Sequence, residues 1–255
     1  MPQSGPPEFR VIGVTNMPMV QRGDDLAQQI VDAATAQGTP LQDGDIVAVT
    51  QRVVSKAEGR VYPLDDFTPS PFALQFAERT EKDPRVVEAV LRESKRIIRQ
   101  AGAVLITETH HGFKMANAGV DASNVGGMDL VCLLPVDPDA SCRGLRDDIQ
   151  RIAGVDVAIV MTDTFGRPWR LGQTNIAIGV AGMRPMRDYI GQPDLDGHIL
   201  RVTLICVADE VAGAAEMVMG KLDAIPVAIL RGYDYDRGEG YATEIVREMP
   251  LDLFP

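Results

Sequence analysis

The sequence predicts a mixed α+β protein, and three observations lead to this class. Short apolar runs rich in β-branched residues recur along the chain and are typical of buried strands. Amphipathic segments with helical spacing lie between some of these runs. Strands and helices do not alternate regularly, which argues against a repeating strand–helix–strand architecture. We expect mixed sheets with helices, arranged as two lobes built from discontinuous segments.

Seven apolar segments are predicted to be strands. The first is Ile46–Thr50, which follows a Gly-Asp pair and is rich in β-branched residues. The other six strands are expected over residues 103–107, 130–135, 157–161, 176–180, 200–207 and 225–230. The polar residues after Thr50 indicate a turn, and residues 63–71, with three prolines, indicate a loop.

Helical spacing is clearest after Asp83-Pro84, because apolar residues recur from Val87 to Ile98 with charged residues on the opposite side. A proline in the first turn of a helix is tolerated, so this helix is expected to begin at Pro84. Three further helices are expected over residues 142–153, 209–220 and 241–249. Residues 1–8 indicate a flexible tail, and residues 9–255 a single domain.

Composition excludes several classes of protein. The chain has 255 residues, of which 45% are apolar and 24% charged, with a net charge of −11. Collagen-like, coiled-coil and wholly disordered proteins differ from this composition. The acidic charge disfavours nucleic acid as a partner, although a local cation or a metal ion allows a small anion to bind in a cleft. No apolar run is long enough to cross a membrane.

The N-terminus lacks the features of a secretory signal, and the three cysteines form no Cys-x-x-Cys pair. A cytoplasmic protein with reduced thiols is therefore expected. Phosphate-binding and dinucleotide-binding glycine motifs are absent from the sequence, as is the Gly-x-Ser-x-Gly of serine hydrolases. Catalysis is therefore expected to depend on carboxylates, amides and the backbone.

Three polar segments are candidates for a site. Residues 109–124 place Asp121 and Asn124 three positions apart, where both side chains can face one ligand. An Asx-rich turn that satisfies its own backbone explains this segment equally well. The segment at residues 50–59 adds Lys56 as a point charge for a polyphosphate, although a lysine at the end of a strand is usually solvated.

The third segment follows the apolar strand at 157–161, where Asp163 and Thr164 offer oxygen ligands for a divalent cation that Asp121 would share. Clamping of a planar anionic substrate is the role considered for Arg167, Trp169 and Arg170. The alternative is that Asp163 caps a turn and the arginines are solvated.

Four segments in this order resemble the coenzyme F420-0:L-glutamate ligase family. They are TQRVVSKAEG at 50–59, HGFKMANAGVDASN at 111–124, LPVDPDASCRGLR at 134–146 and TDTFGRPWRLGQTN at 162–175. Members of this family use GTP and divalent metal ions to join L-glutamate to the phospholactyl carboxylate of a deazaflavin precursor, F420-0. The resemblance implies an acyl-phosphate intermediate, an α+β fold and a homodimer. It also implies Mg²⁺ or Mn²⁺ at two sites, and K⁺.

The resemblance assigns roles to individual positions. Asp121 and Asp163 match the metal-binding, catalytic aspartates, and Thr164 matches a further metal ligand. Residues that match GTP contacts are Met17, Pro18, Met19, Val20, Gln51, Lys56, Asn124, Met219, Gly220 and Lys221. The loop that contains Met17 is about three residues longer than in the family, and some members have a metal-binding Gln in place of Lys221. Many bacterial relatives have a C-terminal flavin-reductase-like domain, which is not expected here.

Two alternatives to this function remain open. A related ligase would act on a different acid and amine, and a non-catalytic protein would bind GTP without releasing phosphate. Arg167, Arg170 and His111 are the residues considered for the anionic substrate. A structural protein without a ligand would leave the expected convergence of Asp121, Asn124 and Asp163 unexplained.

Overall fold

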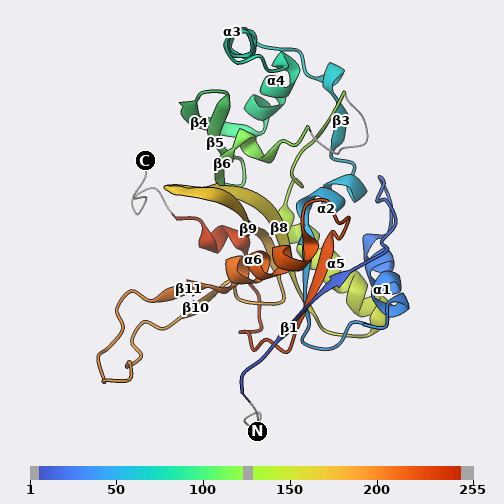
Figure 1. The fold of residues 1–255 in the computed structure, drawn as a ribbon, viewed down its shortest axis with the longest axis vertical. Coiled ribbons are helices and arrows are strands. Elements are labelled where there is room, and N and C mark those ends of the chain that lie inside the picture. Colours follow the sequence, from blue (N-terminus) through green and yellow to red (C-terminus); the bar gives the residue numbers. More distant parts are fainter. Residues whose placement is uncertain (1–5, 123–128, 248–255) are drawn as a thin grey trace.

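The structure is a computed structural model that describes residues 6–122 and 129–247 (Figure 1). Within these residues the main sheet has five strands in the order β1-β12-β2-β8-β9. Their bounds are Arg10–Val14 (β1), Val227–Arg231 (β12), Ile46–Thr50 (β2), Ala158–Arg167 (β8) and Arg170–Ala181 (β9). The pair β2–β8 is parallel, and the other neighbours in this sheet are antiparallel.

Four helices lie beside the main sheet, and we call them, with the sheet, the main sheet region. They are α1 (Leu26–Ala36), α2 (Gln51–Ala57), α5 (Pro138–Ala153) and α6 (Val207–Met219). Helices α5 and α6 both pack against β9, and α1 packs against α5. A Cβ atom at Gly179 would lie 2.7 Å from the Pro138 carbonyl oxygen, so the close approach of α5 to β9 requires glycine there.

A second part of the chain, residues 64–119, we call the α3–α4 region. It contains α3 (Pro71–Thr80), α4 (Pro84–Arg92) and a sheet of β4 (Ser94–Ala101), β5 (Val104–Thr109) and β6 (Lys114–Ala116), beyond β8 and β9 in Figure 1. Short 3₁₀ turns, η1 and η2, lie at Leu64–Asp66 and Asn117–Gly119. One cluster of its buried residues comprises Ala73, Phe76, Val87, Val90, Leu105 and Ala118.

The remaining strands form two small antiparallel pairs. Strand β3 (Val61–Pro63) pairs with β7 (Leu130–Cys132), and β10 (Met186–Asp188) pairs with β11 (Leu204–Cys206). A last 3₁₀ turn, η3, spans Ala242–Ile245. In Figure 1 the segment between β10 and β11 extends away from the rest of the fold. Among the described residues, no helix has both the length and the apolarity that crossing a bilayer requires.

The mixed α+β class predicted from the sequence is confirmed. The division into two lobes and the homodimer remain predictions. Strand β2 has the expected bounds, and the strands expected at 103–107 and 225–230 are close to β5 and β12. The strands expected at 157–161 and 176–180 are the inner parts of β8 and β9, which continue outward as one hairpin.

The helix expected to run from Pro84 through Ile98 is wrong in its second half. It ends at Arg92, and residues 94–101 form β4, paired with β5. The pairing outweighs the local periodicity, because β-branched Ile97 and Ile98 fit a pleated sheet.

Four other predicted elements are corrected. The turn after Thr50 is helix α2, the strand expected over 130–135 is the shorter β7, and that over 200–207 is only β11. In place of the helix expected over 241–249, the structure has η3, and residues from 248 lie outside the described part.

Candidate active site

The parallel strands β2 and β8 end side by side, with Thr50 opposite Thr162. Ligand sites in sheets with parallel strands commonly lie beyond their carboxyl ends. After Thr50 the chain turns into α2, whereas after Thr162 it continues along β8 through Asp163 and Thr164. Polar side chains of the two strand ends therefore face a common space.

This space is a cavity of about 470 Å³. Its walls come from the loop before α1, the start of α2, the outer half of the β8–β9 hairpin and the segment that follows α6. The residues expected to contact GTP or metal that line it are Met17, Pro18, Met19, Val20, Gln51, Lys56, Asp163, Thr164, Met219, Gly220 and Lys221. The cavity therefore collects segments that are more than 200 positions apart in the sequence, as the separation of Met17 and Lys221 shows.

The walls are held by local hydrogen bonds. The Gln51 side chain is 4% exposed, and its Oε1 accepts a hydrogen bond of 2.9 Å from the Ser55 hydroxyl one turn along α2. At the other wall, helix α6 ends at Met219, and its C-cap Gly220 has a φ of 57°, which turns the chain toward Lys221. A left-handed backbone at this point suits glycine, so Gly220 sets the direction in which the Lys221 segment leaves the helix.

Asp121 is not among the residues that line the cavity, but its side chain is bound to one that is. Backbone hydrogen bonds of 2.9 and 2.8 Å pair Asp121 with Cys132. Its carboxylate forms an ion pair with the guanidinium of Arg52, which lies in the cavity wall. Asn124, the other expected site residue of this segment, lies outside the described residues.

Burial raises the pKa of Asp163 to about 7, and the negative charge of Asp121 acts in the same direction. The Thr164 backbone N–H and the cations Arg52 and Lys221 partly oppose this rise. These influences show that Asp163 shares its electrostatic surroundings with Asp121, Arg52 and Lys221. A cation that binds in the cavity would favour the charged carboxylate, because opposite charge lowers the pKa of an acid.

Thr164 belongs to a closed ring of polar contacts. Its hydroxyl donates to Asn175 Oδ1 at 2.9 Å and accepts a hydrogen bond from Lys221 Nζ. Lys221 Nζ also lies 3.1 Å from Glu216 Oε1. The ring closes because Glu216 Oε2 accepts a hydrogen bond of 2.9 Å from the Asn175 backbone N–H.

The donor set fits a small hard cation. Asp121, Asp163 and Thr164 supply only oxygen atoms, which Mg²⁺ and Mn²⁺ prefer. Buried Thr162 Oγ1, also in the cavity wall, has no hydrogen-bond partner in the part of the chain that the structure describes. Within the described ranges no group of three or more His, Cys, Asp and Glu side chains is placed to hold a metal ion. An ion here would therefore need phosphate oxygens or water to complete its coordination, as is common for Mg²⁺.

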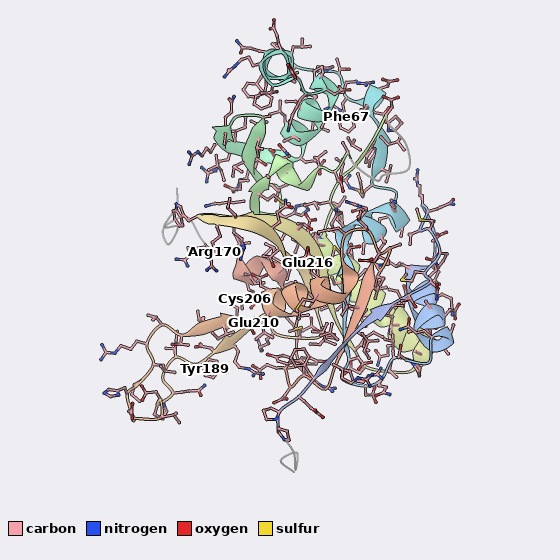
Figure 2. The ribbon with its side chains drawn as sticks, viewed as in Figure 1. Phe67, Arg170, Tyr189, Cys206, Glu210 and Glu216 are labelled. Atoms are coloured by element: carbon pink, nitrogen blue, oxygen red, sulfur yellow. The ribbon has the colours of Figure 1, made fainter. Side chains whose placement is uncertain are left out.

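The residues considered for the anionic substrate do not line the cavity. Arg167, Trp169 and Arg170 are at the outer end of the β8–β9 hairpin, where Figure 2 shows Arg170, and the Trp169 side chain is 80% exposed. His111 Nε2 lies 2.9 Å from the Pro135 carbonyl oxygen and 3.1 Å from that of Val136. The structure therefore does not bring these four residues together with the aspartates as one clamp.

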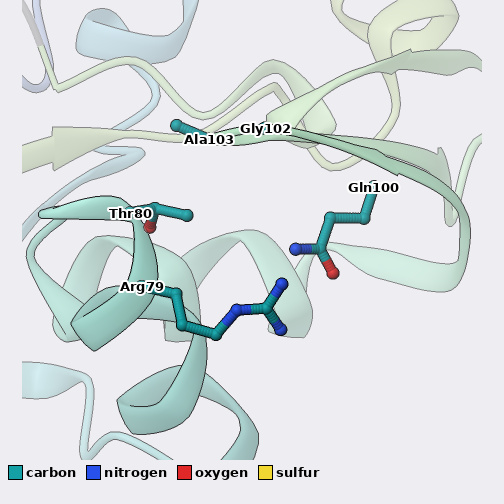
Figure 3. Close-up of a pocket in the computed structure, with 5 residues that line it drawn as sticks. All are labelled: Arg79, Thr80, Gln100, Gly102 and Ala103. Atoms are coloured by element: carbon teal, nitrogen blue, oxygen red, sulfur yellow. The ribbon is translucent and has the colours of Figure 1, made fainter.

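A second hollow, of about 560 Å³, lies in the α3–α4 region (Figure 3). The side chains of Arg79 and Gln100 point toward it from the end of α3 and from β4. None of the expected site residues lines this hollow. It also lacks a carboxylate in its wall, so it is a poorer candidate for metal-dependent chemistry.

Three polar residues of the site were not assigned roles from the sequence: Arg52, Asn175 and Glu216. Arg52 and Asn175 fall within the segments singled out above, and only the folded chain shows which atoms they contact. Glu216 has no local signal, because a glutamate on an amphipathic helix is usually a solvated surface residue. Its role in the ring becomes visible once α6 is packed on β9.

Comparison with known proteins gives a consistent result. The family model for F420-0:gamma-glutamyl ligase matches residues 15–232. The chain is 45% identical over 247 residues to the coenzyme F420:L-glutamate ligase of Methanothermobacter thermautotrophicus, covering 96% of this chain and 98% of that protein. It is 44% identical to the ligase of the same name from Methanopyrus kandleri, and the match covers 98% of this chain and 99% of that protein. The corresponding Methanocaldococcus jannaschii protein is 40% identical over 84% of this chain and 86% of its own length.

Proposed function

This chain belongs to the F420-0:gamma-glutamyl ligase family, and from this premise we propose that it is a ligase that joins L-glutamate to coenzyme F420-0 in F420 biosynthesis. We further propose that GTP and a divalent cation, Mg²⁺ or Mn²⁺, drive the reaction. The observation that carries the proposal is the 470 Å³ cavity, whose wall combines Asp163 and Thr164 with the cations Arg52, Lys56 and Lys221. This mixture of oxygen ligands and positive charge suits a metal-bound triphosphate.

The proposed reaction has two balanced steps. In the first, an oxygen of the substrate carboxylate bonds to the γ-phosphorus of GTP, the bond to the β–γ bridging oxygen breaks, and GDP leaves. In the second, the glutamate amine attacks the acyl carbon, releases phosphate and loses a proton, which leaves an amide. The acyl phosphate is needed because a free carboxylate has no adequate leaving group. No protein nucleophile is required, so positioning and electrostatics supply the catalysis.

The chain's own residues have separable roles in this scheme. Asp121 and Asp163 would hold the divalent cation, which when bound neutralises charge on the transferring phosphoryl group. Lys56 and Lys221 would bind phosphate oxygens as point charges. The loop at Met17, Pro18, Met19 and Val20 would cover one side of the nucleotide, because these residues line the cavity.

The direct test is mass spectrometry of F420-0 incubated with the protein, L-glutamate, GTP and Mn²⁺. We expect a mass gain of one or more glutamyl units, together with GDP and phosphate. Omission of GTP or addition of a chelator is expected to abolish the gain. A gain that persists without GTP would contradict the proposed phosphoryl transfer, and the absence of any gain would contradict the assigned substrate.

Two other functions are distinguished by the same incubation. A ligase for a different acid and amine would release phosphate only with another pair of substrates from a panel of carboxylic acids and amino acids. A non-catalytic GTP-binding protein would bind GTP in calorimetry and release no phosphate with any pair. Because the Asp163 region combines carboxylate and hydroxyl groups, phosphoryl transfer is favoured over binding alone.

We also propose a homodimer, with the β10–β11 segment in its interface. Apolar side chains of this segment are unusually exposed: Leu195 fully, Val202 by 85% and Ile199 by 55%. Such a surface is typical of a protein–protein contact. Light scattering of the wild-type protein is expected to give twice the chain mass of 27.6 kDa, and Leu195→Asp should shift it toward the monomer. A monomeric wild-type protein would contradict the dimer.

A further inference from the structure

Two cationic side chains are bound to the oxygen atoms that were expected to hold divalent cations. Arg52 pairs with Asp121, and Lys221 donates to the Thr164 hydroxyl. Both cations line the same cavity as Asp163, and both lower its pKa. The positions of two divalent ions in this site would therefore coincide with positions that the chain already supplies with positive charge.

Lys221 is held on several sides. Its ammonium contacts Thr164 and Glu216, and both of these are fixed in turn by Asn175. The Lys221 residue follows directly on the C-cap of α6, Gly220, and the carboxyl end of a helix attracts a cation. To place a divalent ion at the Thr164 hydroxyl, the protein would have to break this ring and bring a second cation close to the ammonium.

Arg52 is held less completely. Its ion pair is with Asp121, and its buried Nε atom has no hydrogen-bond partner among the described residues. The side chain is 36% exposed, so its guanidinium has solvent-accessible space into which to move. Replacement of Arg52 by a divalent ion at Asp121 and Asp163 would leave the guanidinium available to phosphate oxygens, which it binds well.

We propose that this site takes one divalent ion, bound by Asp121 and Asp163, and that the Lys221 ammonium replaces a second one. This inference rests on the proposed function, since it concerns a triphosphate bound in the same cavity. A lysine ammonium is a compact point charge with three donors, able to contact a phosphate oxygen while it keeps Thr164 and Glu216. The Thr164 hydroxyl then positions Lys221 instead of a metal.

The test counts Mn²⁺ ions bound to the protein with a non-hydrolysable GTP analogue, by electron paramagnetic resonance of unbound Mn²⁺ during titration. We expect one ion per chain in the wild-type protein. In Lys221→Gln an amide oxygen replaces the ammonium beside Thr164 and Glu216, and two ions are expected. Lys221→Met removes the charge without supplying an oxygen, so we expect one ion and a nucleotide affinity about 10- to 100-fold weaker.

Lys82→Gln is the matched control, because it removes one positive charge before α4 and outside the cavity wall. It is expected to bind one ion with wild-type nucleotide affinity. Thermal unfolding of each variant checks that the fold is intact.

Two ions in the wild-type protein, or one ion in Lys221→Gln, would overturn the inference while leaving the ligase proposal in place. Failure of the proposed function is a different result, namely no GTP-dependent mass gain with F420-0 and glutamate. A single ion in the wild type with two in Lys221→Gln supports the inference whichever acid the enzyme uses.

Discussion

The main sheet region and the α3–α4 region are stabilised in different ways. Strands β2 and β12 are almost fully buried, and Ile46, Val47 and Ile229 are inaccessible to solvent. Strand β4 of the α3–α4 region, by contrast, has no fully buried residue, and Ile97 is 39% exposed. The main sheet region depends on the burial of apolar side chains away from water. The α3–α4 region leaves much more of its surface in contact with water.

The second region contains several ion pairs. Glu108 contacts Arg96 at 2.6 Å and Lys95 at 3.3 Å, and Arg85 contacts Asp83 and Asp65, each at 2.7 Å. Exposed ion pairs contribute little each, so a network is needed for a measurable effect.

The candidate site draws on both types of structure. Asp163 extends from a buried strand of the main sheet, whereas Asp121 lies just after the α3–α4 region and is fixed by Cys132. The apolar sheet therefore positions one aspartate directly. The other depends on how the returning segment is paired.

The largest expected effect tests the difference in burial. Ile229→Ala removes a fully buried side chain from the centre of the main sheet and should lower the free energy of unfolding by about 2–5 kcal/mol. The matched change Ile97→Ala on exposed β4 should cost less than about 1 kcal/mol. Urea unfolding measures both. Equal losses would show that the two regions do not differ in the way proposed.

The second prediction separates the two aspartates. Asp163→Asn and Asp121→Asn are each expected to lower kcat/KM for ligation by about 100-fold or more, because each removes a charged ligand of the proposed cation that would stabilise phosphoryl transfer. Their stabilities should differ. Asp163→Asn removes a partly buried carboxylate whose ionisation is already disfavoured and should not lower Tm, whereas Asp121→Asn removes the ion pair with Arg52 and should lower it.

Activity assays and calorimetry at pH 8 check this pair. Wild-type turnover in folded Asp163→Asn would contradict the metal assignment. A lower Tm for Asp163→Asn than for Asp121→Asn would contradict the comparison between the two positions.

The smallest effect concerns pH. Hydrogen bonds from Arg96 hold the pKa of Glu108 below its usual value, so its stabilisation is present at neutral pH and is lost as the pH falls through the folded-state pKa. Burial raises the pKa of Asp139, so the stability linked to it falls as the pH rises above the unfolded value of about 4. The two carboxyl groups therefore affect stability with opposite signs.

Calorimetric Tm values between pH 3 and pH 8 test these signs. The Tm of Glu108→Gln should be about 1 to 3 °C below that of the wild type at neutral pH, and the two Tm values should converge in acid. The amide of Asp139→Asn can still accept the backbone hydrogen bonds of Val180 and Ala242. The Tm of this variant should therefore rise relative to that of the wild type as the pH rises. Parallel curves for both variants would rule out the opposite signs.

The sequence predicts the buried parts of the fold better than the exposed parts. Strand β2 is recognisable because a strand buried on both faces is a continuous apolar run. The boundary between α4 and β4 is not, because Ile97 and Ile98 continue the helical spacing of Val87 and Val90. Only the pairing of β4 with β5 decides between the two, and the spacing of apolar residues does not reveal that pairing.

The candidate site is also only partly predictable from the sequence. Individual residues such as Asp163 and Lys56 are identifiable from motifs, but their partners are not. The contact between Lys221 and Thr164 joins residues 57 positions apart and requires α6 to be packed on β9. For the same reason the sequence does not distinguish Arg52 from an ordinary charged surface residue, because its ion pair with Asp121 forms only in the folded chain.

The parallel pairing of β2 with β8 has a consequence for folding of the chain during its synthesis on the ribosome. Ile46 pairs with Ala158, so about 110 residues must be closed into a loop before this edge of the sheet exists. Closing so long a loop costs little more at equilibrium than closing one of half the length, about 0.6 kcal/mol, but contacts between distant residues slow folding. Because Pro226 also lines the cavity, the nascent chain cannot complete this cavity until residue 226 has left the ribosome. A ligand that binds in this cavity can thus stabilise only a chain that has been synthesised beyond this residue.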